Sequence, residues 1–288
     1  MRIHQLNCGT MGGLVPTRVL LVEAPDALVL VDSGIGLLDI ADPAGRLGAM
    51  RHALRPALRT GETAVRRIGA LGLDPQDVRH IVLTHMDADH IGGLADFPEA
   101  QVHVAAQALT WAVRTPRFVE RRRYRRPQWS HGPRFVEYSY GTDRWEGFRA
   151  HPLDHVAEGM MLVDLPGHAV GHAGVLVPGG GRTGGDGDHD RVHGNDDDDK
   201  DLLHAGDAFY HRGQIGQTGR VPRSIPALER ALALEPGARR RTRTSPTARP
   251  HSPNSSGAGG RWCSPAPASR PRRASPTTAG PIRPAGPR

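Results

Sequence analysis

The segment of residues 82–93 places four side chains that can bind a metal within six positions, directly after a short apolar run. These side chains are His85, Asp87, Asp89 and His90. The two carboxylates repel each other on one tight loop, whereas a divalent cation neutralises both and uses the imidazoles as neutral donors. The alternative is a polar loop whose histidines cap the backbone. The two following glycines and the preceding strand favour the metal site.

The spacing of apolar residues predicts a chain in which strands alternate with helices. Short β-branched runs indicate strands, and the expected strands are residues 19–23, 28–31, 78–83, 102–104, 174–177 and 202–205. A helical period covers residues 47–71, and a further helix is expected over residues 105–113. This alternation is typical of a layered α/β fold.

Four segments of the chain resemble one known family. His85, Asp87, Asp89 and His90 stand where the metallo-β-lactamase superfamily carries its H-x-H-x-D-H signature, and two glycines follow as they do there. Three further segments look like those of the family in the same order, and they are Asp32-Ser33-Gly34, Pro166-Gly167-His168-Ala169-Val170-Gly171-His172 and Ala205-Gly206-Asp207. The resemblance covers residues 2–235 and implies the four-layer αββα fold of that family.

The resemblance also implies a set of metal ligands. One metal is expected on His85, Asp87 and His168, and a second on Asp89 and His90. Asp207 is expected to bridge the two. His172 and Asp32 resemble groups that support the ligands without binding metal themselves.

The chemistry implied by such a site is hydrolysis through a metal-bound hydroxide, which needs no serine or cysteine nucleophile. Asp89, as a ligand beside the water, is expected to carry the proton to the leaving group. Tyr210 follows Asp207 by three residues, where lactone-cleaving members of the family place a tyrosine. Its phenol either donates to the developing oxyanion or caps a strand end, and both readings stay open.

Two features depart from the pattern of the family. Asp87 replaces the usual second histidine, so the resemblance implies one or two Zn²⁺ ions, with iron or manganese also accepted at this harder site. The family places its last metal histidine on a late strand, and here His251 lies between two prolines that forbid a central strand. We therefore expect an incomplete second site, and metal binding mainly through His85, Asp87, His168 and Asp207.

Residues 114–126 contain seven arginines together with two aromatic residues. Such a run is usually a solvated helix face. An arginine-rich lid that recognises an anion over the metal site is the second reading, because the family often builds its substrate pocket from this part of the chain. The pattern leaves both readings open.

The composition changes sharply near residue 236. Residues 236–288 carry 11 arginines and no acidic residue, whereas the preceding residues carry 26 basic and 30 acidic side chains. We expect residues 1–235 to form the domain, with a flexible Asp- and Gly-rich loop insertion at 179–201, and residues 236–288 to be a disordered Arg/Pro/Ser-rich tail. The domain is then expected to lack the last strand and helix of the family, and a shifted reading frame in GC-rich DNA is our hypothesis for the tail.

The leading functional reading is a metallo-hydrolase of a small carbonyl substrate, which is a lactone, an ester or a thioester. The alternatives are an impaired metal-binding protein that lacks the second-site histidine, and a phosphodiesterase or nuclease of the same superfamily. A small molecule is the expected partner; a membrane or nucleic acid is not. Two cysteines far apart in the chain and no leader segment favour a cytoplasmic protein. The substrate and the oligomeric state cannot be read from the sequence.

Overall fold

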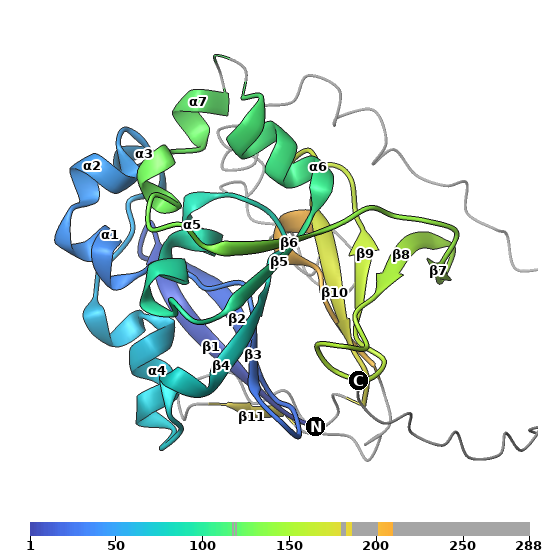
Figure 1. Ribbon diagram of the computed structural model, residues 1–288. Coiled ribbons are helices and arrows are strands. Elements are labelled where there is room, and N and C mark those ends of the chain that lie inside the picture. Colours follow the sequence, from blue (N-terminus) through green and yellow to red (C-terminus); the bar gives the residue numbers. More distant parts are fainter. Residues whose placement is uncertain (117, 119, 180–182, 186–200, 210–288) are drawn as a thin grey trace, which may run out of the picture. The chain divides into compact units, whose positions relative to one another are not determined.

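The computed structural model describes residues 1–116, 118, 120–179, 183–185 and 201–209. These residues all belong to one of two compact units, Met1–Thr244, and the second unit, Ser245–Arg288, falls outside the described part of the chain. Two β-sheets form the centre of the first unit (Figure 1). Within the described ranges, no helix is long and apolar enough to cross a membrane.

The first sheet has seven strands, and one of them leads directly into the ligand motif of residues 85–90. Its order is β11 (Thr183–Gly185), β1 (Arg2–Met11), β2 (Val15–Glu23), β3 (Leu28–Val31), β4 (Val78–Val82), β5 (Gln101–Ala105) and β6 (Arg134–Tyr138). Strands β3, β4, β5 and β6 are parallel to one another, while β1, β2 and β3 pair antiparallel. All four residues of β3 are buried, which explains why this strand is continuously apolar in sequence.

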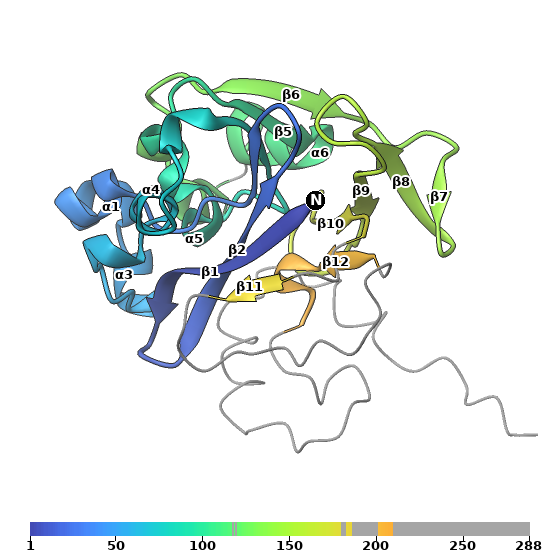
Figure 2. The same ribbon diagram turned by 90° about the horizontal axis from the view of Figure 1, so that it is seen from below.

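The second sheet has five strands that pair antiparallel. Its order is β12 (Leu202–His204), β10 (Ala173–Val177), β9 (Met161–Asp164), β8 (Phe148–Pro152) and β7 (Arg144–Trp145). One hydrophobic core contains buried residues of both sheets, among them Leu21, Val29, Leu162 and Val175. The two sheets therefore pack face to face around a shared core, as Figure 2 shows from below.

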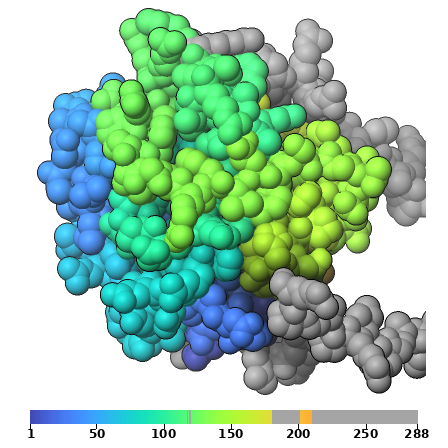
Figure 3. Space-filling model, in the orientation of Figure 1, coloured from blue at the N-terminus to red at the C-terminus, as the bar shows by residue number. Residues whose placement is uncertain are grey.

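Helices lie against the first sheet and above its upper end (Figure 1). The α-helices are α1 (Leu37–Ala41), α2 (Pro43–Leu47), α3 (Met50–Leu54), α4 (Ala64–Ala70), α5 (Ala88–Ile91), α6 (Ala106–Leu109) and α7 (Glu120–Arg123). The 3-10 and π turns are η1 (Thr60–Glu62), η2 (Pro75–Asp77), η3 (Gly92–Asp96), η4 (Thr110–Arg114), η5 (Arg126–Gln128) and η6 (Gly206–Ala208). In the space-filling view, the segment that contains α6 and α7 forms the upper part of the face that Figure 3 shows.

The expected α/β fold with two sheets is confirmed, and the bounds of the six expected strands differ from the observed ones by no more than four residues. The single helix expected over residues 47–71 is wrong. Arg55 and Leu58 have positive φ angles of 49° and 50° around Pro56, and a proline cannot donate the hydrogen bond that a continuing helix needs. The segment is therefore divided among α3, η1 and α4.

The Asp- and Gly-rich insertion differs in part from the expected loop. Thr183–Gly185 forms β11, which pairs parallel with Ile3, His4 and Gln5 of β1. Pairing of this kind satisfies backbone groups that an edge strand would otherwise expose. Residues 180–182 and 186–200 and the expected tail lie outside the described residues. The expected lack of the last strand and helix therefore stays a prediction.

Candidate metal centre

The candidate ligands meet where strands of both sheets end. His85 follows β4, Asp87 precedes α5, and Asp89 and His90 lie within α5. The second sheet contributes His168 from the β9–β10 connection and Asp207 from η6, which follows β12. The structure thus brings together the six side chains that the sequence predicts as ligands, which are His85, Asp87, Asp89, His90, His168 and Asp207.

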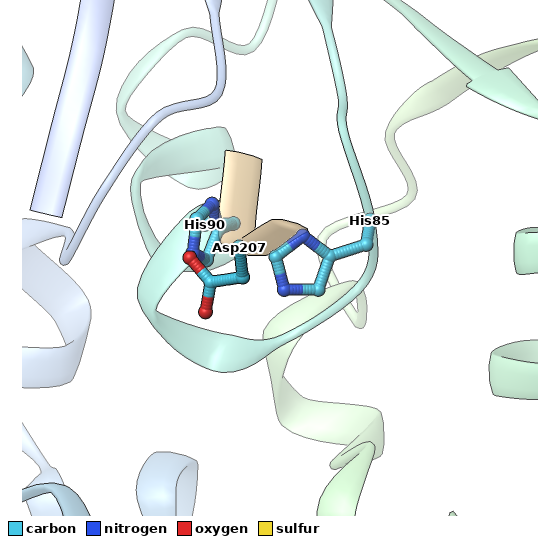
Figure 4. A group of neighbouring side chains, drawn as sticks. All are labelled: His85, His90 and Asp207. Atoms are coloured by element: carbon cyan, nitrogen blue, oxygen red, sulfur yellow. The ribbon is translucent and has the colours of Figure 1, made fainter. Parts of the chain in front are cut away.

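One group of ligand atoms comes from His85, His90 and Asp207, and we call it the His90 cluster. One potential ligand atom from each residue lies within 4.8 Å of the other two. Nε2 of His90 is 3.3 Å from Oδ1 of Asp207 and 3.8 Å from Oδ2 of Asp89. Figure 4 shows the side chains of His85, His90 and Asp207 converging from separate segments of the chain. The mixture of imidazole and carboxylate donors is one that zinc and other divalent metals accept.

Hydrogen bonds fix which nitrogen of His85 is available to a metal. The hydroxyl of Thr84 donates its one proton to Asp32 at 2.8 Å, so it can only accept from Nδ1–H of His85 at 2.9 Å. Burial and the nearby His90 lower the pKa of His85 to about 4, so this ring is neutral. Its Nε2 is therefore unprotonated, yet it lies 3.1 Å from the acceptor Oδ2 of Asp87. A cation bound between Nε2 of His85 and Oδ2 of Asp87 would interact favourably with the lone pairs of both atoms.

His90 is arranged in the same way. Its Nδ1 donates to Oδ2 of Asp32 at 2.8 Å, which directs Nε2 toward Asp207. Burial opposes the charged form, but the carboxylates of Asp207, Asp32 and Asp89 hold the pKa of His90 well above its usual range. These carboxylates thus create a strong local preference for positive charge, which a bound metal would meet.

A second group of ligand atoms comes from His85, Asp87 and His168, and we call it the Asp87 cluster. Oδ2 of Asp87 is 2.9 Å from Nε2 of His168. Arg123 of α7 reaches into this cluster, with its Nε and Nη2 each 2.5 Å from an oxygen of Asp87. Burial alone would raise the pKa of Asp87, but the Arg123 guanidinium holds it well below its usual range.

Asp32 positions the ring of His90 directly and the ring of His85 through the hydroxyl of Thr84. It accepts hydrogen bonds from the backbone N–H and the hydroxyl of Thr84 and from the ring of His90, all at 2.8 Å. Its φ angle is 62°, a conformation that few non-glycine residues adopt. The carboxylate is fully buried, and despite that burial His90 and His204 keep its pKa below its usual range. Asp32 fixes the orientation of the rings, as carboxylates behind metal-binding histidines do.

His172 positions the chain around Asp207. Its Nδ1 donates to the carbonyl of Leu165 at 2.9 Å, and its Nε2 accepts from the backbone N–H of Asp207 at 3.2 Å. Gly206 has a φ of +50°, and a Cβ there would lie 2.9 Å from both His172 and Thr84. Only glycine fits at this position, and His172 acts on Asp207 through the backbone and not as a ligand.

Asp89 and Tyr210 were the expected catalytic groups. Asp89 is buried beside the ligands, and its burial, together with Asp207 and Asp87 and against the effect of His90, raises its pKa to about 6. Such a carboxyl can both take up and release a proton near neutral pH. Tyr210 and its neighbour His211, like His251, lie outside the described residues.

Another set of rings lies apart from these ligands, and we call it the histidine chain. Nδ1 of His80 is 2.9 Å from Nε2 of His103, whose Nδ1 is 2.7 Å from the hydroxyl of Tyr138. That hydroxyl is 2.8 Å from Nε2 of His155. No carboxylate takes part in these hydrogen bonds, and among the described residues the chain forms no group of potential metal ligands.

The sequence pattern did not identify Arg123 as a site residue. Of the arginine-rich segment, Arg123 is buried, whereas Arg114, Arg121, Arg122 and Arg126 are exposed. The solvated face is therefore present at these four arginines, and Arg123 enters the site and pairs with Asp87. A lid that recognises an anion stays a prediction. The available signal was a carboxylate at position 87 where a neutral histidine was expected, because a buried carboxylate needs a cation nearby.

A sequence model described as "Metallo-beta-lactamase superfamily" matches residues 12–238. A probable metallo-hydrolase of Mycobacterium tuberculosis is 48% identical over 237 residues, which cover 81% of this chain and 70% of the relative. An N-acyl homoserine lactonase, AttM of Azorhizobium caulinodans, is 28% identical over 188 residues, or 61% of this chain and 66% of that protein.

Solved structures are similar at lower identity. One is a B. thuringiensis AiiA variant with N-decanoyl-L-homoserine bound at the active site, with 17% identity and a TM-score of 0.47 over 61% of this chain and 70% of that one.

Proposed function

Because the chain belongs to the metallo-β-lactamase superfamily, whose members include metallo-hydrolases, we propose that it hydrolyses a small carbonyl compound and depends on a divalent metal. A lactone, an ester or a thioester is the proposed substrate class. The enzyme is a hydrolase of this superfamily by its relatives; the metal, the substrate and the roles of individual residues are our proposal.

The observation that carries the proposal is the pair of histidine nitrogens aimed at carboxylates. Nδ1 of His85 and Nδ1 of His90 are both committed to Thr84 and Asp32, so each ring presents Nε2 to the site. Both Nε2 atoms face carboxylate oxygens, of Asp87 and Asp207. A site of this composition binds a divalent metal, and we propose His85, Asp87, Asp89, His90, His168 and Asp207 as its ligands.

A divalent metal held there would supply the Lewis acidity that activates water and polarises a carbonyl. The chain itself orients the ligands through Asp32 and His172 and handles the proton. We propose that the carboxyl of Asp89 takes up the proton lost by the attacking water and returns it to the leaving oxygen or sulfur. Tyr210 is proposed to donate to the developing oxyanion.

Zinc is the proposed metal, and Asp87 makes iron and manganese acceptable alternatives. Lactones are the first substrates to test, because the relatives that have a stated activity are N-acyl homoserine lactonases. A small-molecule partner and a cytoplasmic location complete the proposal. Exposed arginines next to α7 do not by themselves favour a nucleic acid.

The test is hydrolysis of N-acyl homoserine lactones, aryl esters and acyl thioesters by the full chain, before and after chelation and after readdition of Zn²⁺. We expect activity that chelation abolishes and zinc restores. His90→Ala should lose metal and activity, whereas His155→Ala, which changes an exposed histidine outside the site, should keep both. Metal-independent turnover would contradict the proposal, and bound metal without turnover would identify an impaired enzyme.

A further inference from the structure

The guanidinium of Arg123 lies among atoms that the family uses for a metal. Its Nη2 is 2.5 Å from Oδ2 of Asp87 and 2.9 Å from Nε2 of His168, and its Nε is 2.5 Å from Oδ1 of Asp87. The side chain of Arg123 is 6% exposed. This arginine is therefore a buried part of the site and not a member of the solvated face of α7.

The contacts show what the guanidinium does for its partners. Nη2 carries two protons, enough for one hydrogen bond to Asp87 and one to His168. Nε2 of His168 lies 2.9 Å both from Nη2 of Arg123 and from Oδ2 of Asp87. One positively charged group thus contacts a carboxylate oxygen and an imidazole nitrogen, which are the two atom types that a metal would join.

Charge explains why an arginine enters here. A histidine at position 87 would be neutral, and a guanidinium beside it would gain little. Asp87 instead offers two oxygens, and Arg123 meets both in a fork that suits its planar geometry. A divalent cation on the same oxygens would have to approach a guanidinium of like charge in a buried site, where repulsion is weakly screened.

We propose that Arg123 takes the place of one metal ion in the Asp87 cluster, so that the protein holds a single divalent metal in the His90 cluster. This inference rests on the proposed metal-dependent function, and it narrows the six proposed ligands to His85, Asp89, His90 and Asp207. It reverses the sequence-based expectation that metal binds mainly through His85, Asp87, His168 and Asp207. The His90 cluster has Asp89 beside it, and its ion pairs with Asp89 and Asp207 come from the ring of His90 itself, a side chain that can bind a metal.

The test counts metal ions per chain. The parent, Arg123→Gln and Arg122→Gln are each dialysed to equilibrium against Zn²⁺ and measured by elemental analysis, with calorimetric titration for affinity. Arg122 is the matched control, because it lies next to Arg123 in α7 but is exposed over the ring of Phe118. We expect one ion in the parent, two in Arg123→Gln and one in Arg122→Gln.

Two ions in the parent, or one in Arg123→Gln, would overturn the inference. No ion in any of the three would instead overturn the proposed function. Because Arg123→Gln leaves Asp87 without its cation and could fail to fold, a second pair of variants tests the same point. His168→Ala should keep the single ion of the parent, and His90→Ala should lose it; the opposite result would place the metal in the Asp87 cluster and sink the inference.

Discussion

The proposed metal centre and the histidine chain are both built from closely spaced rings, but only the proposed metal centre contains carboxylates. Around His90, the carboxylates of Asp207, Asp32 and Asp89 hold the pKa above its usual range. Around His103, burial first, and then His80 and His155, lowers the pKa to about 3. A histidine thus favours its positively charged form in the proposed metal centre and its neutral form in the histidine chain.

The difference teaches that spacing of histidines alone does not make a metal site. In the histidine chain, the rings of His80, His103 and His155 and the phenol of Tyr138 satisfy one another through hydrogen bonds. In the proposed metal centre, Nε2 of His85 and Nε2 of His90 face carboxylate oxygens, whose negative charge a bound cation would neutralise. Carboxylates therefore decide which cluster can bind metal.

The largest expected effect comes from removing the carboxylate that the metal centre depends on. Asp32→Ala leaves the hydrogen-bond donors of Thr84 and His90 without their buried acceptor. We expect metal affinity to fall by a factor of about 10–100, and the free energy of unfolding to fall by about 3–5 kcal/mol. Metal titration and urea denaturation measure the two.

The control for this change is Asp164→Ala, which removes a carboxylate paired with the half-exposed Arg149 in the second sheet. It should leave metal affinity unchanged and lower stability by no more than about 1 kcal/mol. Equal metal affinity in the parent and in Asp32→Ala would break the comparison, because the carboxylate would then not distinguish the two regions.

The next effect is the response of the histidine chain to acid. The pKa of His103 is about 3 in the fold against an ordinary value of 6.5, so below pH 6.5 the unfolded chain binds a proton that the folded chain does not. The stabilisation is complete above pH 6.5 and is lost as the pH falls toward 3. One pKa unit corresponds to about 1.4 kcal/mol, so about 2 kcal/mol should be lost between pH 6.5 and 5.

Urea denaturation of chelated protein at several pH values measures this slope. His103→Gln removes the titrating ring while keeping a polar side chain near His80, Tyr138 and His155, the groups that face it. The variant should lose stability less steeply with acid than the parent does. Parallel pH profiles would mean that His103 is not held neutral by its surroundings.

The smallest effect concerns the hydroxyl within the histidine chain. Tyr138→Phe removes the group that joins Nδ1 of His103 to Nε2 of His155. We expect a loss of about 1 kcal/mol in unfolding free energy and no change in bound metal. A lower metal content in this variant would show that the two regions are coupled.

Local patterns predicted the parts of the site that are close together in sequence. Four of the ligands lie on the loop after β4 and on α5, so residues that are close in sequence are also close in the fold. They are His85, Asp87, Asp89 and His90. The parallel pairing of β3 with β4 brings Asp32 under this loop, as expected for a residue that follows a neighbouring strand.

The contribution of Arg123 could not be predicted in this way. Seven arginines crowd the segment of residues 114–126, and only the tertiary path of α7 decides which one turns inward. The broken helix around Pro56 is a second case, since the apolar period continues through a residue that cannot continue the hydrogen bonding. In both cases the outcome depends on contacts between segments and not on local preference.

The position of Asp207 also has a consequence for the order in which the protein forms. The loop after β4 supplies His85 and His90 early in synthesis, but Asp207 arrives only after β12, which pairs with β10. An unfinished chain therefore carries the imidazoles without the carboxylate that completes the His90 cluster. We therefore expect tight metal binding to come late in synthesis. A ribosome-bound chain that ends before β12 should bind the metal with lower affinity than the complete chain does.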